Sequence, residues 1–219
     1  MPREARNAKR TPRDGRTGKI NPRNTEYFLI VTDAKQTEQN YLKGFQKSLP
    51  QNIQHRISIK IIQETSQKKL INECKRFANI DPKYYRHIWI VLDRDEVPTF
   101  DKIIADAKKN DIKVAWSNPC IEIWFSAYFE NIKTQTSTKQ AIDAFKELFK
   151  QKTNHPYLKN DDEIYKRLLQ FGDETNAIKR AEQKRNEHTS AGITKPSAMI
   201  PATTVHELIS EMRKIVAEN

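Results

Sequence analysis

The sequence contains little glycine, which accounts for 5 of its 219 residues. It holds neither a G-x-x-x-x-G-K-[ST] segment nor a G-x-G-x-x-G segment, the glycine-rich loops that hold phosphates and dinucleotides. The lack of both segments argues against ATP hydrolysis by this chain and against a dinucleotide cofactor.

Cysteine and long apolar runs are also scarce. Cys74 and Cys120 are too few for a disulfide framework and do not have the C-x-x-C spacing of a metal site. The five histidines show no zinc spacing, and no nucleophile-elbow motif is present. No run of about eighteen apolar residues marks a membrane span, and the basic first residues do not have the apolar centre of a secretory signal. We therefore expect a cytoplasmic protein without membrane contact.

Positive charge is what the chain has in excess. The net charge is +11 and the pI is about 9.6, which indicates a polyanionic partner, most simply nucleic acid. Residues 1–24 carry eight basic residues against two acidic ones and almost nothing apolar. We expect a disordered leader that either orders on a phosphate backbone or only keeps the protein in solution. The leader residues predicted to contact nucleic acid are Arg3, Arg6, Lys9, Arg10, Arg13 and Arg16.

Segments of strand and helix character alternate along the first 130 residues. Runs of β-branched and aromatic residues predict strands at 26–32, 57–63, 87–92 and 113–117. Apolar stripes of helical period predict helices after each of them, at 37–49, 70–77, 100–107 and 121–129, with Thr37 as an N-cap and Pro50 ending the first. This order predicts an α/β fold in which a parallel, Rossmann-like sheet carries helices on both faces.

The rest of the chain is predicted to be helical. Apolar stripes lie at 141–149, 164–169 and 205–216, a polar helix is expected at 173–189, and residues 190–201 are expected to form a loop. We expect three parts: a leader at 1–24, an α/β core at 25–130, and a helical region at 131–219. The last part is either a separate domain or, as we favour, a helical extension packed on the core.

Polar residues follow three of the predicted strands. Asp33 follows the first strand, Asp93 and Asp95 end the third, and Ser117 and Asn118 follow the fourth. Because ligands of a parallel sheet bind beyond the carboxyl ends of its strands, we expect these side chains to meet at one edge.

Asp93 and Asp95 are the strongest candidates for chemistry. On an extended chain, residues two apart point to the same face, and paired carboxylates there suit a hard cation such as Mg2+. Bound metal activates water or stabilises a departing oxygen in phosphodiester cleavage. A solvated turn, with Asp95 or Glu96 capping the next helix, is the alternative interpretation. Asp33 is a ligand or general base, or else a turn residue.

Two further acidic residues have two interpretations each. Glu38 either pairs with a base at the sheet edge or simply stabilises a helix N-terminus. Glu122 lies in the first turn of a helix that we expect to begin at Pro119, capped by Ser117 or Asn118, and could face the edge as another carboxylate.

The remaining distinctive residues of that stretch fit the core better than a site. We expect Trp116 and Trp124 to be buried packing residues in preference to base-stacking platforms. Cys120 has no histidine near it in the sequence, so we expect a small buried residue and not a nucleophile.

Three segments resemble the RloB family of defence-associated proteins, whose core is similar to the Toprim fold. The apolar strand and T-E-x-x-Y of 27–41 resemble the first motif of that family, D-R-D of 93–95 a second, and S-N-P-C-I-E-I-W of 117–124 a third. The segment 201–206 and the basic leader are similar as well. The resemblance therefore spans most of the chain.

The resemblance implies a Toprim-type site in which Asp33, Asp93 and Asp95 hold Mg2+ or Mn2+. It implies a nuclease in a phage-defence or restriction-linked system, with RNA (tRNA in particular) favoured over DNA, and a partner ABC-like ATPase. One position departs from the family pattern, because Asp33-Ala34 stands where the family usually has Glu-Gly. Aspartate is shorter by one methylene group, and Mg2+ is demanding in its geometry.

The resulting hypothesis is a Mg2+-dependent nuclease with Asp33, Asp93, Asp95 and Glu122 as its catalytic residues. Outside the leader, the residues predicted to contact nucleic acid are Arg94, Ser117, Asn118, Lys179, Arg180, Lys184 and Arg185. The rival hypothesis is a non-catalytic nucleic-acid-binding sensor or adaptor that works with a partner ATPase. A plain interaction module is a third. The sequence indicates no particular oligomeric state.

Overall fold

The computed structural model of the chain describes residues 27–32, 36–62, 67–80, 85–95 and 97–217. The predicted leader and Asp33 lie outside these ranges. Four strands were predicted and all four are present, as β1 (Tyr27–Thr32), β2 (Ile57–Ile61), β3 (Tyr85–Asp93) and β4 (Lys113–Asn118). They pair in parallel in the order β2-β1-β3-β4, and a short β5 (Ala202–Thr203) adds an antiparallel edge beside β4.

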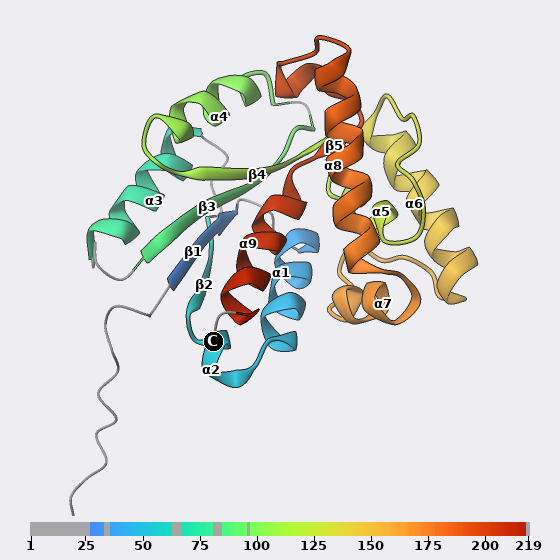
Figure 1. Cartoon of the computed structure of the whole chain (residues 1–219), viewed down its shortest axis with the longest axis horizontal. Helices are drawn as coiled ribbons and strands as arrows, with labels where there is room; N and C mark the ends of the chain where they lie inside the picture. The colour runs from blue at the N-terminus through green and yellow to red at the C-terminus, as the bar shows by residue number, and fades with distance from the viewer. Residues whose placement is uncertain (1–26, 33–35, 63–66, 81–84, 96, 218–219) are drawn as a thin grey trace, which may run out of the picture.

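Helices cover both faces of the sheet, which confirms the predicted α/β class (Figure 1). Alternate residues of β1 point to opposite faces. Phe28 and Ile30 join the core under α1 (Thr37–Ser48) and α9 (Val205–Ala217), whereas Leu29 and Val31 join the core under α3 (Gln67–Ile80) and α4 (Phe100–Lys108). Both cores are well filled, since these four strand residues are 0–2% exposed.

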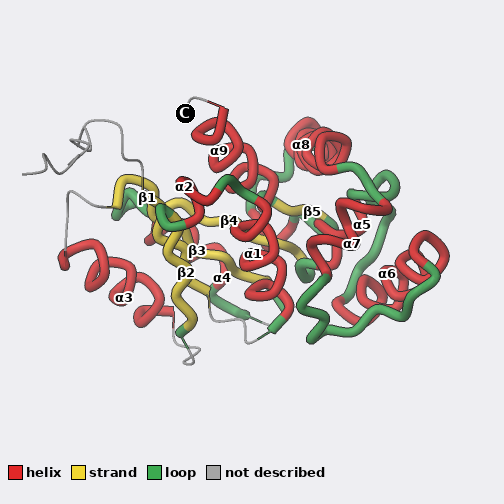
Figure 2. Tube along the Cα trace, turned by 90° about the horizontal axis from the view of Figure 1, so that it is seen from below, coloured by secondary structure: helices red, strands yellow, loops and turns green. Residues whose placement is uncertain are grey.

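Four further helices gather at one end of the sheet (Figure 1). They are α5 (Glu122–Ala127), α6 (Thr138–Thr153), α7 (Ile164–Phe171) and α8 (Glu174–Ser190). α7 contacts α1, α8 contacts α5 and α9, and α9 contacts β4. Figure 2 shows α6 at the opposite end of the molecule from α3. No helix in the described ranges is long and apolar enough to cross a membrane.

Several predicted boundaries were wrong for identifiable reasons. Gln36, not Thr37, is the N-cap of α1, and the Thr37 hydroxyl instead donates to the Lys159 carbonyl at 3.0 Å. The helix expected from Pro119 begins at Glu122 with Ile121 as its N-cap, and Asn118–Pro119 is a cis peptide.

Three short elements were not predicted from the sequence. They are α2 (Gln51–Gln54), the 3-10 helix η1 (Pro196–Ala198) inside the expected loop 190–201, and β5 directly after it. Trp116, Trp124 and Cys120 are buried, at 4%, 0% and 3% exposure, as predicted.

Candidate functional site

Asp93 forms the centre of the candidate site, at the carboxyl end of β3. β3 pairs with β4, where Asp93 lies opposite Ser117. The Asp93 Oδ2 atom accepts a 2.9 Å hydrogen bond from the backbone N–H of Ile121, the residue that caps α5. Its other oxygen, Oδ1, is buried and has no hydrogen-bond partner in the described part of the chain. One oxygen is thus held in place, and the other makes no hydrogen bond to the described residues.

Acidic neighbours surround Asp93. Burial raises the pKa of Asp93 well above its usual range, and the negative charges of Glu38 and Glu122 raise it further. The Ile121 N–H opposes this effect, and Asp95 adds a smaller contribution in the same direction as the other acids. A cation at this place would remove the repulsion that these carboxylates exert on one another.

Glu122 is a buried carboxylate that a distant tyrosine holds. Its side chain is 2% exposed, and Oε1 accepts a 2.9 Å hydrogen bond from the hydroxyl of Tyr157. Burial and the Glu122 charge raise the pKa of Tyr157, so its hydroxyl stays protonated and acts as a donor. Burial and the same carboxylate raise the pKa of Cys120, which keeps that thiol neutral.

Asp95 lies beyond the end of β3, so the extended chain from which we predicted a shared face for Asp93 and Asp95 does not reach Asp95. β3 ends at Asp93, and Asp95 sits in a turn with φ = 34°, where its backbone N–H donates to the Pro119 carbonyl at 3.0 Å. Its side chain is exposed, and Oδ1 accepts a 3.0 Å hydrogen bond from the Thr138 hydroxyl at the start of α6. The Asp93 Oδ1 atom is buried, whereas the Asp95 side chain is exposed.

The donor chemistry of this region fits a hard divalent cation. Carboxylate oxygens are the ligands that Mg2+ takes, and Mg2+ is usually held by one or two of them together with water and substrate phosphates. Asp93 Oδ1 is a buried oxygen to which no residue in the described ranges donates a hydrogen bond. Within the described ranges, no three His, Cys, Asp or Glu side chains are already grouped to hold one ion. Asp33 lies outside those ranges.

Ser117 and Asn118 lie inside the protein. Ser117 is 1% exposed and its hydroxyl lies 3.1 Å from that of Thr203. Asn118 is 0% exposed, and its Nδ2 donates to the carbonyls of Pro196 and Ser197 at 3.0 and 3.1 Å. Both side chains thus connect the end of β4 to the segment 196–203.

The basic residues predicted to contact nucleic acid differ in their exposure and in the hydrogen bonds and ion pairs that they already form. Arg94 is half-buried and its Nη1 donates to the Asp95 carbonyl at 3.2 Å. On α8, Lys179 is exposed and Lys184 pairs with Glu187 at 3.1 Å. Arg180 donates to the Ala127 carbonyl at 2.7 Å, and Arg185 pairs with Glu207. Thus Arg180 and Arg185 help to attach α8 to the rest of the protein.

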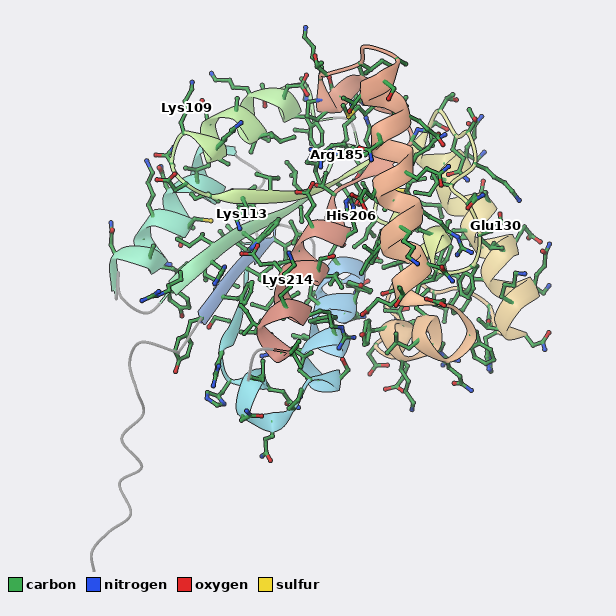
Figure 3. The ribbon with its side chains drawn as sticks, in the orientation of Figure 1. Lys109, Lys113, Glu130, Arg185, His206 and Lys214 are labelled. Atoms are coloured by element: carbon green, nitrogen blue, oxygen red, sulfur yellow. The ribbon has the colours of Figure 1, made fainter. Side chains whose placement is uncertain are left out.

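Two sizeable cavities in the described part of the chain lie away from these residues, beside β4. One of about 640 Å³ and one of about 620 Å³ share Trp89, Lys113, Arg185 and Glu207 as lining residues. Figure 3 shows that Lys113, Arg185, His206 and Lys214 come together there from β4, α8 and α9. Lys113 pairs with Glu211, and burial followed by the Arg185 charge lowers the pKa of His206 to about 4, which keeps it neutral at neutral pH. Of the candidate catalytic residues that the structure describes, Asp93, Asp95 and Glu122 line neither cavity.

Three residues of the site were missed or left undecided by sequence reasoning. Glu38 belongs to the T-E-x-x-Y motif. Its charge acts on Asp93 from α1, a proximity that the spacing of the two residues in the sequence does not show. Tyr157 and Thr138 reach the site from the helical region at 131–219, and no local pattern marks either of them.

Comparison with known proteins agrees with the motifs. The family model described as RloB-like protein matches residues 28–212, which covers most of the chain. No curated protein and no solved structure matches the chain.

Proposed function

The chain belongs to the RloB-like protein family, and on that premise we propose that it is a divalent-metal-dependent nuclease of antiphage defence. The observation that carries this proposal is the Asp93 carboxylate. It ends a parallel strand, keeps one buried oxygen that no described residue hydrogen-bonds, and has Glu38 and Glu122 as its acidic neighbours. A buried carboxylate whose pKa is raised by specific charged neighbours is typical of functional sites.

Each acidic residue has a distinct part in this proposal. Asp93 holds the metal through Oδ1, with Asp33 and Asp95 as the further ligands implied by the family pattern. Bound Mg2+ or Mn2+ supplies a Lewis acid for the phosphodiester group and an activated water. Glu122, held by Tyr157, and Glu38 add negative charge next to Asp93, which favours a cation there and disfavours the ionised carboxylate without one.

The substrate in this proposal is nucleic acid, with RNA favoured over DNA. The net charge of +11 supports a polyanionic partner, because each phosphate contact made by Lys or Arg releases counterions. Lys179 remains exposed for such contacts on α8, and the leader adds the basic residues from Arg3 to Arg16. Binding should therefore weaken steeply as salt is raised.

A direct test combines substrates, metals and one isosteric variant. Purified protein is incubated with total tRNA, mRNA, single-stranded DNA and duplex DNA, each with Mg2+, Mn2+ or EDTA. Asp93→Asn removes the charge and keeps the shape, while Asp143→Asn, at an exposed position on α6, is the matched control. Metal-dependent cleavage that Asp93→Asn loses and Asp143→Asn retains supports the nuclease and identifies its substrate class.

One observation favours the rival function, a nucleic-acid-binding sensor or adaptor that works with a partner ATPase. The Thr138 hydroxyl donates to the exposed Asp95 carboxylate, which lies in a turn beyond the end of β3. Under this rival, nucleic-acid binding persists unchanged in Asp93→Asn, and the wild-type protein cleaves no substrate with any divalent ion, alone or with its partner.

A further inference from the structure

The loop that joins α6 to α7 contacts the candidate site at two points. The Tyr157 hydroxyl donates to Glu122 Oε1 at 2.9 Å, and the Lys159 carbonyl accepts a 3.0 Å hydrogen bond from Thr37 at the start of α1. The loop therefore links the helical region at 131–219 to the ends of two elements that carry acidic residues of the site, namely α1 with Glu38 and α5 with Glu122.

Tyr157 is held rigidly in this position. Its side chain is 5% exposed, and its ring packs edge-on against Phe145 and Phe149, with centroid distances of 4.7 and 5.9 Å. Both phenylalanines lie on α6 and are 0% exposed. Because aromatic packing fixes the ring, it also fixes the place from which the hydroxyl donates.

Glu122 depends on such a donor. A carboxylate that is 2% exposed has lost most of its water, and an ionised group without compensating hydrogen bonds is strongly disfavoured there. A hydrogen bond to an ionised acceptor is also stronger and more directional than one between neutral groups. The hydroxyl of Tyr157 therefore both stabilises the Glu122 charge and restricts the orientation of its carboxylate.

We propose that Tyr157 is a positioning residue of the nuclease site: it fixes Glu122, and through Glu122 it determines how strongly a divalent cation binds beside Asp93. This inference rests on the proposed function and adds to it a residue from outside the sheet. Tyr157 acts only through Glu122, so its contribution disappears when Glu122 has no charge to hold.

A double-mutant cycle tests this dependence. The proteins are wild type, Tyr157→Phe, Glu122→Gln and the double variant. Tyr165→Phe is the matched control, because Tyr165 is also buried and its hydroxyl donates at 2.9 Å to a glutamate, Glu174, that is not part of the site. Phenylalanine keeps the ring packing in both positions. Three quantities are measured for each protein: the Mn2+ dissociation constant by titration calorimetry, kcat and KM for the substrate found above, and Tm.

We expect Tyr157→Phe to weaken Mn2+ binding and lower kcat, each on the order of 10- to 100-fold, the usual effect of losing a residue that orients a metal ligand. KM for nucleic acid should change little. In the Glu122→Gln background, Tyr157→Phe should have no further effect, because a coupled pair is not additive. Tyr165→Phe should leave both quantities at the wild-type level.

Other results would overturn the inference. If Tyr157→Phe binds Mn2+ and cleaves like the wild type, Tyr157 does not act through Glu122. The same conclusion follows if the affinity and kcat lost in the double variant equal the sum of the losses in the two single variants. If Tyr157→Phe unfolds at the assay temperature, Tyr157→His replaces it, since a ring N–H should restore part of the affinity; no restoration in a folded Tyr157→His protein counts against the inference.

The failure of the proposed function gives a different pattern. If the cycle shows coupled effects on Mn2+ affinity but the wild-type protein cleaves no substrate, the nuclease proposal is wrong, and the positioning of Glu122 by Tyr157 stands. A wild-type protein that neither binds Mn2+ nor cleaves would sink both.

Discussion

The Asp93 carboxylate accepts a 2.9 Å hydrogen bond from the backbone N–H of Ile121, 28 residues further along the chain. This contact joins the end of β3 to the start of α5, the helix that presents Glu122. The second oxygen of the same carboxylate is buried and has no hydrogen-bond partner among the residues that the structure describes. An acid held in one place, half satisfied and surrounded by other acids stores unfavourable energy in the absence of a cation.

Asp93→Asn should therefore stabilise the metal-free protein. The substitution removes the charge that Glu38 and Glu122 oppose, so the free energy of unfolding rises at neutral pH in EDTA. For a chain of this length each kcal/mol gained raises Tm by about 2–4 °C. Differential scanning calorimetry measures the change.

Divalent metal should reverse this order. Millimolar Mg2+ should raise the Tm of the wild type and leave that of Asp93→Asn unchanged, since a ligand stabilises only the state that binds it. A variant that melts below the wild type in EDTA, with a normal fold, would contradict the strained-carboxylate interpretation.

The stability difference between these two proteins should depend on pH. The pKa of Asp93 is raised in the folded state above its ordinary value of 3.8, so the folded protein binds this proton more tightly than the unfolded chain. The stability that Asp93 contributes is fully present below about pH 3.8 and is lost as pH rises through the raised pKa. The advantage of Asp93→Asn should accordingly grow from about pH 4 upward. Urea unfolding in EDTA across that range measures it, and a constant difference would show that the raised pKa is absent.

Asp95 can be tested without disturbing its turn. Its φ of 34° is a conformation that asparagine adopts readily and alanine does not. Asp95→Asn should keep the wild-type Tm within about 1 °C, whereas Asp95→Ala should lose roughly 1 kcal/mol to backbone strain. If Asp95 is a metal ligand, Asp95→Asn lowers metal-dependent cleavage at least tenfold. Thr138→Val removes the hydroxyl that donates to Asp95 and leaves the Asp95 charge in place. Comparing it with Asp95→Asn therefore separates the effect of the orientation of Asp95 from the effect of its charge.

Asn118 should prove to be a structural residue. In Asn118→Asp, a carboxylate would face the carbonyls of Pro196 and Ser197, where the native amide donates two hydrogen bonds. An unpaired charge at a position with 0% exposure costs about 3 kcal/mol or more, which lowers Tm by roughly 6 °C or more. Asn131→Asp, at an exposed position, is the control. Weaker nucleic-acid binding at an unchanged Tm would instead support the contact role predicted from the sequence.

The strands and most helices could be predicted because local patterns determine them. The runs that become β1 and β3 are apolar on both faces, as a strand covered on both sides requires, and the helical stripes coincide with buried faces such as that of Tyr41, Leu42 and Phe45 on α1. β5 could not be predicted, since only two residues pair and the Thr204 backbone and hydroxyl complete the contact with β4.

The site was harder to predict than the fold. Motif spacing drew attention to Asp93 and Glu122, and it treated Asp95 as part of an extended strand, whereas the strand ends two residues earlier. Tyr157 reaches Glu122 from 35 residues away, a contact that depends on how α6 packs and leaves no local pattern. Arg180 and Arg185 look like exposed cations in the sequence, yet each is engaged within the fold.

The most direct test of the central claim is cleavage of tRNA by the wild type and by Asp93→Asn, with Mg2+ or Mn2+ and with EDTA, in the presence of the partner ATPase if one is encoded nearby. The proposed function predicts cleavage by the wild type only with metal, reduced at least a hundredfold in Asp93→Asn while nucleic-acid binding and fold are retained. Equal cleavage by both proteins, or salt-sensitive binding with no cleavage under any of these conditions, would contradict it.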